Sequence, residues 1–424
     1  MRTLFGTNSP SLTVRAARLW LAVCCLSFVW RPVQAQNYTF TDLHPPGVDR
    51  SEACSVSGSN QVGFAGTADR ALMWSGTAGS VVDLTPSGFT KCAAQGISGT
   101  RQVGYGSGTP TGSNYHALLW SGTAESVVDL NPSGYSASYA LGISGNQQVG
   151  NGFGPLGQGA LLWFGTAESA VDLNPIGFTG SHGLGISGSQ QVGRGYGPST
   201  ENNYHALLWT GSAESVVDLN PAGFTATFAQ GTSGSQQAGY GYGSATSYGI
   251  HALLWSGTAE SYVDLNPSGF TSSHANAASG NQQVGDGAGP TGIHALLWSG
   301  TAESHVDLHD FLPPGYNTSY AQSIDANGNI AGLALDTETG QAHAVLWTIS
   351  GAQPTGPLLG ITRSGQDIVL SWPTNPPPFT LQSASSLNLP VNWVDCTNIP
   401  VIVGAQFTVT ITVSGSGQVY RLKR

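Results

Sequence analysis

Histidine recurs at one fixed place in this sequence, and its imidazole can bind a metal ion or transfer a proton. Each copy begins a His-Ala-Leu-Leu-Trp or His-Ala-Val-Leu-Trp string, while Arg70 and Gly159 stand at the same place in two further copies. Zinc holds an imidazole nitrogen at about 2 Å, whereas equivalent positions on packed sheets lie about 10 Å apart. We therefore expect a structural or solvent-facing role and predict no metal site. The histidines are His116, His205, His251, His294 and His343.

An aspartate recurs with the same regularity, in an Asp-Leu pair placed nine residues after each of the first six tryptophans of these strings. Each Asp-Leu is followed by an x-Pro-x-Gly turn, and an aspartate before a turn can accept backbone N–H bonds. A catalytic acid–base pair needs carboxylates in unlike surroundings, and similar copies supply similar surroundings. No catalytic residue is therefore predicted among the repeated positions. These aspartates are Asp83, Asp129, Asp172, Asp218, Asp264 and Asp307, and a seventh Asp-Leu pair, at Asp42, comes before the first tryptophan.

Aromatic residues gather in the connections that precede the histidine position, and these connections vary in length between copies. They are rich in Gly, Tyr, Ser and Asn and almost free of Lys and Arg. Loops on a rigid scaffold often carry recognition, and this composition favours a glycan or a protein surface over a phosphate. Drift in length without function is the alternative. The candidate ligand-binding residues are Tyr105, Tyr115, Phe153, Tyr196, Tyr204, Tyr240, Tyr242 and Tyr248.

The elements that position these residues follow from the repeat. Strings such as "HALLW", "VVDL", "ALGIS" and "QQVG" predict four short antiparallel strands per unit of about 45 residues. A lone four-stranded sheet cannot bury both faces, so the units must stack. The predicted fold class is all-β: a seven-bladed β-propeller over residues 36–350. The last copy has no "VVDL" of its own, and residues 38–43 are predicted to close that blade.

The repeated tryptophan lies in the apolar part of each string and could stack on a sugar or pack between blades. Its position beside two aliphatic residues favours packing. The copies are Trp74, Trp120, Trp163, Trp209, Trp255, Trp298 and Trp347.

The pattern "HALLWSG…VVDL…GISGSQQVG" resembles the HAF-type bacterial extracellular repeat over residues 38–350, with Leu where that pattern has Phe. The resemblance implies a secreted repeat protein. It implies no activity that can be transferred residue by residue.

Both ends of the chain differ from the repeats. Residues 1–35 predict a signal peptide, with early arginines, an apolar run over 19–30 and cleavage near Ala35. This predicts a secreted or cell-surface protein. A Gly/Pro linker is predicted at 351–357, and a small β-sandwich at 358–424. The sandwich resembles fibronectin-like β domains, with Ile368, Leu370 and Trp372 on one face.

Three cysteines lie beyond the predicted signal peptide: Cys54, Cys92 and Cys396. Cys54 and Cys92 fall near the start of the innermost strand in adjacent repeats, three positions out of register. A disulfide between them is one alternative, against which stands the strict geometry that a disulfide requires.

Charge excludes several partners. Charged residues make up 8% of the chain and its formal net charge is −10, which argues against nucleic acid and acidic membranes. No membrane insertion, no cofactor and a monomer are expected. The leading hypothesis is a secreted, non-catalytic binding or scaffold protein that recognises a glycan or a protein surface.

Two alternatives stay open. One is a structural cell-surface or adhesion component. The other is a propeller-type polysaccharide hydrolase or lyase, which would need unlike polar residues that converge near the axis. The polar residues that do not follow the repeat are His44, Asp49, Arg50, His182, Arg194, His274 and Asp310.

Overall fold

A computed structural model describes residues 37–67, 69–350, 360–364, 367–374, 379–384, 393–403, 406–412 and 419–423. The predicted signal peptide and linker lie outside the described residues. The described chain forms β-strands and three-residue 3-10 helices, so the all-β class is confirmed. No helix in this described part is long and apolar enough to cross a membrane.

Seven four-stranded antiparallel sheets cover the described residues between 38 and 349. In the first six, four strands that are consecutive in the chain lie in sequence order. These sheets are β2–β5 (Ser51–Ser57, Asn60–Ala65, Arg70–Trp74, Val82–Asp83), β6–β9 (Phe89–Ser98, Arg101–Gly108, His116–Trp120, Val128–Asp129), β10–β13 (Ala137–Ser144, Gln147–Gly154, Gly157–Trp163, Val171–Asp172), β14–β17 (Gly180–Ser187, Gln190–Tyr196, His205–Trp209, Val217–Asp218), β18–β21 (Phe224–Thr232, Gln237–Gly243, His251–Trp255, Val263–Asp264) and β22–β25 (Ser272–Ser279, Gln282–Gly289, Gly292–Trp298, Val306–Asp307).

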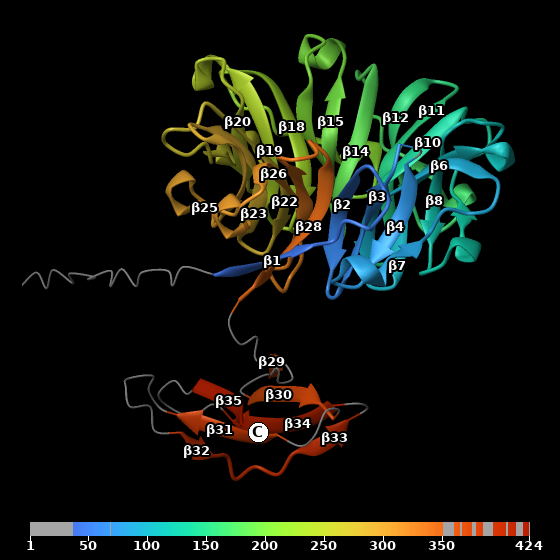
Figure 1. The fold of residues 1–424 in the computed structure, drawn as a ribbon. Helices are drawn as coiled ribbons and strands as arrows, with labels where there is room; N and C mark the ends of the chain where they lie inside the picture. Colours follow the sequence, from blue (N-terminus) through green and yellow to red (C-terminus); the bar gives the residue numbers. More distant parts are fainter. Residues whose placement is uncertain are drawn as a thin grey trace, which may run out of the picture. The chain divides into compact units, whose positions relative to one another are not determined.

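The seventh sheet joins the two ends of the repeat region (Figure 1). It has the order β1-β28-β27-β26, with β1 at Tyr38–Asp42, β26 at Tyr316–Ile324, β27 at Ile330–Asp336 and β28 at Ala342–Ile349. β1 runs antiparallel to β28, with Tyr38 opposite Ile349 and Asp42 opposite Val345. Each sheet packs on the next, and β2 of the first sheet packs on β26, β27 and β28 of the seventh.

Short 3-10 helices occupy the connections. Six follow the third strand of each of the first six sheets, three lie in the longer variable connections, and one precedes the seventh sheet. They are η1 (Ala78–Ser80), η3 (Ala124–Ser126), η4 (Ala167–Ser169), η6 (Ala213–Ser215), η8 (Ala259–Ser261), η9 (Ala302–Ser304), then η2 (Thr109–Thr111), η5 (Pro198–Thr200), η7 (Ser244–Thr246) and η10 (His309–Phe311).

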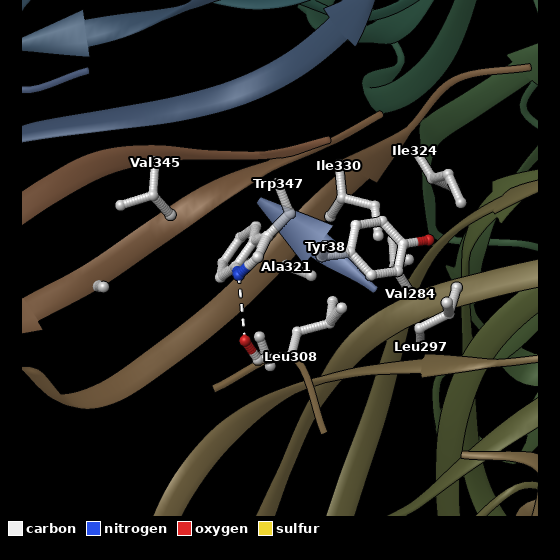
Figure 2. Close-up of a cluster of buried hydrophobic side chains, with 11 residues drawn as sticks. Tyr38, Val284, Leu297, Leu308, Ala321, Ile324, Ile330, Val345 and Trp347 are labelled. Carbon is white, nitrogen blue, oxygen red and sulfur yellow. Dashed lines mark hydrogen bonds between the residues drawn. The ribbon is translucent and has the colours of Figure 1, made fainter. Parts of the chain in front are cut away.

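The repeated tryptophans form cores between neighbouring sheets, as predicted. All seven are fully buried. Figure 2 shows one such cluster, in which Trp347 and Tyr38 of the seventh sheet pack with Val284 and Leu297 of the sixth. The Trp347 indole Nε1 donates a hydrogen bond of 3.0 Å to the Leu308 carbonyl oxygen. Each sheet therefore buries its face against the next one along the chain.

A polar joint accompanies each core and explains the repeated aspartate and histidine. Between the second and third sheets, Asp129 Oδ1 accepts the Asn131 N–H at 2.8 Å, and Asp129 Oδ2 is 2.7 Å from His116 Nδ1. Ser138 of the third sheet donates its hydroxyl to Asn131 Oδ1 at 2.6 Å and accepts the Ala117 N–H at 3.0 Å. The aspartate fixes the turn, as predicted, and it also holds the histidine, which the sequence did not reveal.

The joint that closes the row of sheets uses the same contacts across the two ends of the region. Asp42 Oδ2 is 3.0 Å from His343 Nδ1. His44 takes the place of the asparagine, with Nδ1 2.8 Å from Ser51 Oγ, and that oxygen accepts the Ala344 N–H at 2.9 Å. The segment that contains β1 therefore pairs with β28 and also supplies Asp42 and His44 to the polar joint between the seventh and first sheets.

The joint between the first and second sheets departs from this pattern. Cys92 stands where the other sheets have serine or threonine, and Thr85 Oγ1 accepts the Ala71 N–H at 3.1 Å instead. Arg70 replaces histidine and pairs with Asp83. Cys92 is buried between these two sheets.

The disulfide considered between Cys54 and Cys92 does not form, because both cysteines are free thiols. Cys54 lines the central channel described below, whereas Cys92 packs in the core between two sheets. The three-position offset in register therefore separates the two thiols.

The C-terminal region contains two further antiparallel sheets in its described residues. Leu370, Trp372, Leu381 and Val409 are buried, and Ile368 packs against them, which confirms the predicted apolar face. The sheets have the orders β29-β30-β34-β33 and β32-β31-β35. Their strands are β29 (Gly360–Ser364), β30 (Asp367–Pro373), β31 (Thr380–Ala384), β32 (Val394–Asp395), β33 (Val401–Val403), β34 (Gln406–Thr412) and β35 (Val419–Lys423).

Candidate functional site at the central channel

A β-bulge in the first strand of every repeat sheet aims one side chain away from the ladder. In β10 the register shifts between Ala140 and Gly142, and Leu141 is left without a cross-strand partner. Bulges re-aim side chains in this way. The first strands of all seven sheets line one cavity of about 230 Å³, which we call the central channel. The seven bulged residues line it: Cys54, Gln95, Leu141, Leu184, Gln230, Asn276 and Gln322.

These bulged positions differ between copies although their surroundings repeat. They bring amides, leucines and one thiol to a common space, and none of the seven carries a formal charge. Burial, and then the charge of Glu52, raise the pKa of Cys54, so its thiol stays protonated at neutral pH. A protonated thiol is a weak nucleophile, which argues against cysteine chemistry in the channel.

The strand position two residues before the bulged residue also carries different side chains in different sheets. There the first strands of the fourth, fifth and sixth sheets carry His182, Phe228 and His274, paired across the ladder with Arg194, Tyr240 and Asp286. These six residues, with Tyr204 and Asn276, are called the inner cluster below.

Aromatic contacts link the inner cluster across three sheets. The Tyr204 ring lies 5.7 Å from Phe228, which lies 4.8 Å from Tyr240. Tyr240 in turn meets His274 edge-on at 4.7 Å. The Arg194 guanidinium lies over the rings of Tyr204 and Phe228, at 5.1 and 5.4 Å. Such cation–π contacts hold the guanidinium in place.

A histidine–aspartate pair forms the most chemically capable part of the inner cluster. His274 Nδ1 lies 3.0 Å from Asp286 Oδ2, and the Asp286 residue is 8% exposed. Asn276 donates from Nδ2 to Asp286 Oδ1 at 3.3 Å and to the Ala321 carbonyl at 3.0 Å. The carboxylate therefore orients the imidazole, whose other nitrogen can accept or donate a proton. Nothing else in the described region bonds to that nitrogen.

His182 lies in a different electrostatic setting. Burial, and then the positive charge of Arg194, lower the pKa of His182 to about 4. Its Nδ1 lies 3.5 Å from Gln158 Nε2. At neutral pH this imidazole is therefore uncharged beside a guanidinium.

This pKa shift predicts an acid-sensitive contribution to stability. Between the ordinary histidine pKa of 6.5 and about 4, the unfolded chain binds a proton at His182 that the folded chain does not bind. The free energy of unfolding should therefore decrease as the pH falls through this range. His182→Asn should reduce that decrease, measured by urea denaturation at pH 4 to 7. If the free energy of unfolding fell equally with pH in both proteins, the prediction would be wrong.

The eight predicted aromatic residues fall into three groups: two contact Tyr139, three lie in or next to the inner cluster, and three belong to neither group. Tyr105 and Tyr115 lie 5.6 Å apart and both contact Tyr139 of the next sheet. Tyr204 is a member of the inner cluster, and Tyr196 lies 5.0 Å from it. Tyr240 belongs to the inner cluster itself. Burial raises the pKa of Tyr105 to about 12, so its hydroxyl stays protonated.

Three of the predicted aromatic residues join neither group. Phe153, Tyr242 and Tyr248 make no aromatic contact within the described part of the chain, and Phe153 and Tyr248 are exposed. Sequence reasoning missed Tyr139, Phe228 and Asp286. The signal that could have found them is variation at a fixed strand position of the repeat.

Of the irregular polar residues named from the sequence, His182, Arg194 and His274 meet in the inner cluster. His44 belongs to the closing joint, and Arg50 pairs with Asp69 at 2.5 Å and lies over the Phe64 ring. Asp49 and Asp310 lie outside the cluster. No group of three or more metal-ligating side chains occurs within the described ranges.

Comparisons with known proteins define the fold class. No protein-family model and no curated protein sequence matches the chain. An acylaminoacyl peptidase structure is similar with a TM-score of 0.50 and 10% identity, covering 77% of this chain and 57% of that one. A puromycin hydrolase gives 0.45 and 11%, covering 76% and 58%. The β-propeller domain of the Trilobed protease from Pyrococcus furiosus gives 0.49 and 9%, covering 72% and 96%.

These findings identify a β-propeller fold. The chain spans 57% and 58% of the length of the peptidase and the puromycin hydrolase. The expectation of a non-catalytic binding or scaffold protein is corrected by the same comparison, in which an acylaminoacyl peptidase shares the fold. Of the hypotheses drawn from the sequence, the hydrolase alternative is the better supported.

Proposed function

We propose that this chain is the β-propeller of a peptidase-type hydrolase and that a peptide substrate binds at the inner cluster and the central channel. The observation that carries the proposal is the inner cluster, inside an otherwise repetitive molecule. Its aromatic rings link the His182–Arg194 pair of the fourth sheet to the His274–Asp286 pair of the sixth. The likeness in fold to an acylaminoacyl peptidase supports the reaction class.

The inner cluster contains groups suited to amide hydrolysis. His274, oriented by Asp286, would take a proton from a water molecule as the water oxygen attacks the peptide carbonyl carbon. The same imidazole would then give that proton to the leaving amine. Arg194 and Asn276 carry N–H donors that could hold the substrate carbonyl or its negative charge. The neighbouring rings of Phe228 and Tyr240 would exclude water from the bound peptide.

The direct test is turnover by the intact chain. A panel of acylated aminoacyl and dipeptidyl p-nitroanilides should release nitroaniline, and a polysaccharide panel assayed beside it should give no products. Product from the polysaccharide panel alone would move the reaction class to the glycan hydrolase or lyase alternative. Absence of turnover on both panels would contradict a hydrolase.

Finer features of architecture and location belong to the same proposal. We propose a closed seven-bladed propeller, supported by the seven repeat sheets and by the packing of β2 on β26, β27 and β28. A C-terminal β-sandwich is supported by the two sheets whose residues share one buried cluster. Secretion, and kinship with the HAF-type repeat, are supported by the N-terminal pattern and the repeated strings.

A further inference from the structure

One joint differs from the other six at the place where a histidine or arginine side chain normally pairs with the aspartate. Six joints contain such a pair: His116–Asp129, His205–Asp218, His251–Asp264, His294–Asp307, His343–Asp42 and Arg70–Asp83. The third sheet has Gly159 at this position, beside the Asp172 side chain.

A pocket of about 170 Å³ occupies that place in the third sheet. Its walls include Tyr135, Leu156, Gln158, Asp172 and Asn174. Asp172 Oδ1 accepts the Asn174 N–H at 2.8 Å, as in the other joints. Asp172 Oδ2, which would hold the histidine, has no ion-pair or hydrogen-bond partner in the described parts of the chain.

The sixth sheet shows that a side chain fits this place. Its connection before the histidine position has the same length, Gly-Pro-Thr-Gly-Ile against Gly-Pro-Leu-Gly-Gln. There His294 Nδ1 lies 2.7 Å from Asp307 Oδ2. The backbone at Gly159 is outside the left-handed region. A Cβ built there would lie 3.0 Å from Asp172 Oδ1 and 3.2 Å from the Asn174 Cβ, so both side chains would have to move by a few tenths of an ångström to admit it. Glycine is therefore not required by the backbone, and its effect is to leave the pocket open.

The surroundings favour a long cationic side chain. A second cavity of about 450 Å³ shares Tyr135 and Asp172 as walls and adds the carboxylate of Glu168. Leu156, in the turn between β11 and β12, is 93% exposed, and Ile176, in the turn after β13, is 98% exposed. Exposed apolar surface beside a carboxylate suits an arginine, whose alkyl stem packs while its guanidinium binds the acid.

We propose that the pocket at Gly159 binds the arginine side chain of a peptide ligand, with the guanidinium on Asp172. In the other six joints, a histidine or arginine of this chain pairs with the aspartate. At Asp172 the ligand supplies the cation instead. This site lies on the outer strands of the third sheet and goes beyond the proposed hydrolase function, because binding requires no turnover.

The experiment is titration of the intact protein with the peptide acetyl-Gly-Arg-Gly-amide, followed by calorimetry or by NMR. We expect one site. The citrulline analogue, which has the same shape without the charge, should bind at least about tenfold more weakly, and Asp172→Asn should cause a similar loss, since a lost hydrogen-bonded ion pair at a partly exposed site is worth about 1.4 kcal/mol. Equal affinity for arginine and citrulline would overturn the proposal.

Two further variants test the pocket by filling it or by opening another. Gly159→His restores the repeated pair, so the variant should fold, with an unchanged circular dichroism spectrum, and should lose peptide binding. His294→Gly should open an equivalent pocket in the sixth sheet and raise the number of sites from one to two. Unchanged binding by Gly159→His would contradict the site even if His294→Gly failed to fold.

Methylguanidinium distinguishes a side chain from a free cation. It should compete with the peptide only at higher concentration, because it carries the charge without the stem and the backbone. Equal affinity for methylguanidinium and the peptide would overturn the assignment to a peptide ligand. The peptide titration and the methylguanidinium competition both measure binding and do not depend on hydrolysis. A failed turnover assay therefore leaves their outcome unchanged.

Discussion

Leu43→Ala is expected to lower the free energy of unfolding by about 2–5 kcal/mol, the usual range for a fully buried leucine. Leu43 follows β1 directly and is 0% exposed. It packs with Ala53 and Trp74 of the first sheet and with Leu346 of the seventh. Its N–H donates to the Ala344 carbonyl at 2.8 Å. The substitution therefore leaves a cavity at the place where the two ends of the repeat region meet. Urea denaturation, with comparison of midpoints, measures the loss.

Leu130→Ala is the matched control. Leu130 has the same place in the joint between the second and third sheets, is also 0% exposed, and donates to the Ala117 carbonyl at 2.8 Å. A similar loss of stability is expected. The two variants should differ in local opening, because β1 is tied covalently to only one of the sheets it joins. Amide exchange over residues 38–43 should accelerate in Leu43→Ala alone. A stability loss under 1 kcal/mol in Leu43→Ala, or equal acceleration in both variants, would show that the closing contacts do not limit stability.

The repeat sheets could be predicted from the sequence because their signal is repeated. A single "VVDL" string is weak evidence for a strand, and the structure gives it only two paired residues, such as Val128–Asp129. Six copies, each at the same distance from the preceding tryptophan, make that weak evidence reliable. The absence of the string after Trp347 leads to the role predicted for residues 38–43. The C-terminal region has no repetition, so the signal for each of its strands is not strengthened in this way.

The joints could be predicted only in part. The turn that Asp129 fixes is local, because its N–H partner is two residues away. The histidine that it holds is 13 residues away across a strand pair, and the serine that completes the joint lies in the next sheet. These contacts require the register between strands and the packing between sheets, which the residue pattern alone does not specify.

The candidate site was predicted least well, for a physical reason. The reasoning from sequence placed recognition in the loops, where lengths vary. The structure shows that the positions with unlike side chains around the channel are bulged residues such as Asn276 and the residues two places earlier, such as His274. A bulge is set by strand pairing, so its place cannot be read from hydrophobic alternation. Variation at a fixed position inside a repeated strand was the available signal.

His274→Ala is expected to lower the rate of peptide hydrolysis by about 10²–10⁴-fold, the usual contribution of a general acid–base group. Asp286→Asn should also lower the rate of peptide hydrolysis, because the amide can stabilise the wrong tautomer of the imidazole and cannot stabilise its protonated form. His251→Ala is the control, since it removes a histidine of the same type whose Nδ1 lies 2.7 Å from Asp264 in a joint. That variant should lose stability and keep its kcat. Steady-state kinetics on folded proteins separates the two effects: equal losses of kcat in His274→Ala and His251→Ala would mean that both histidines act through the fold, and that the inner cluster performs no proton transfer.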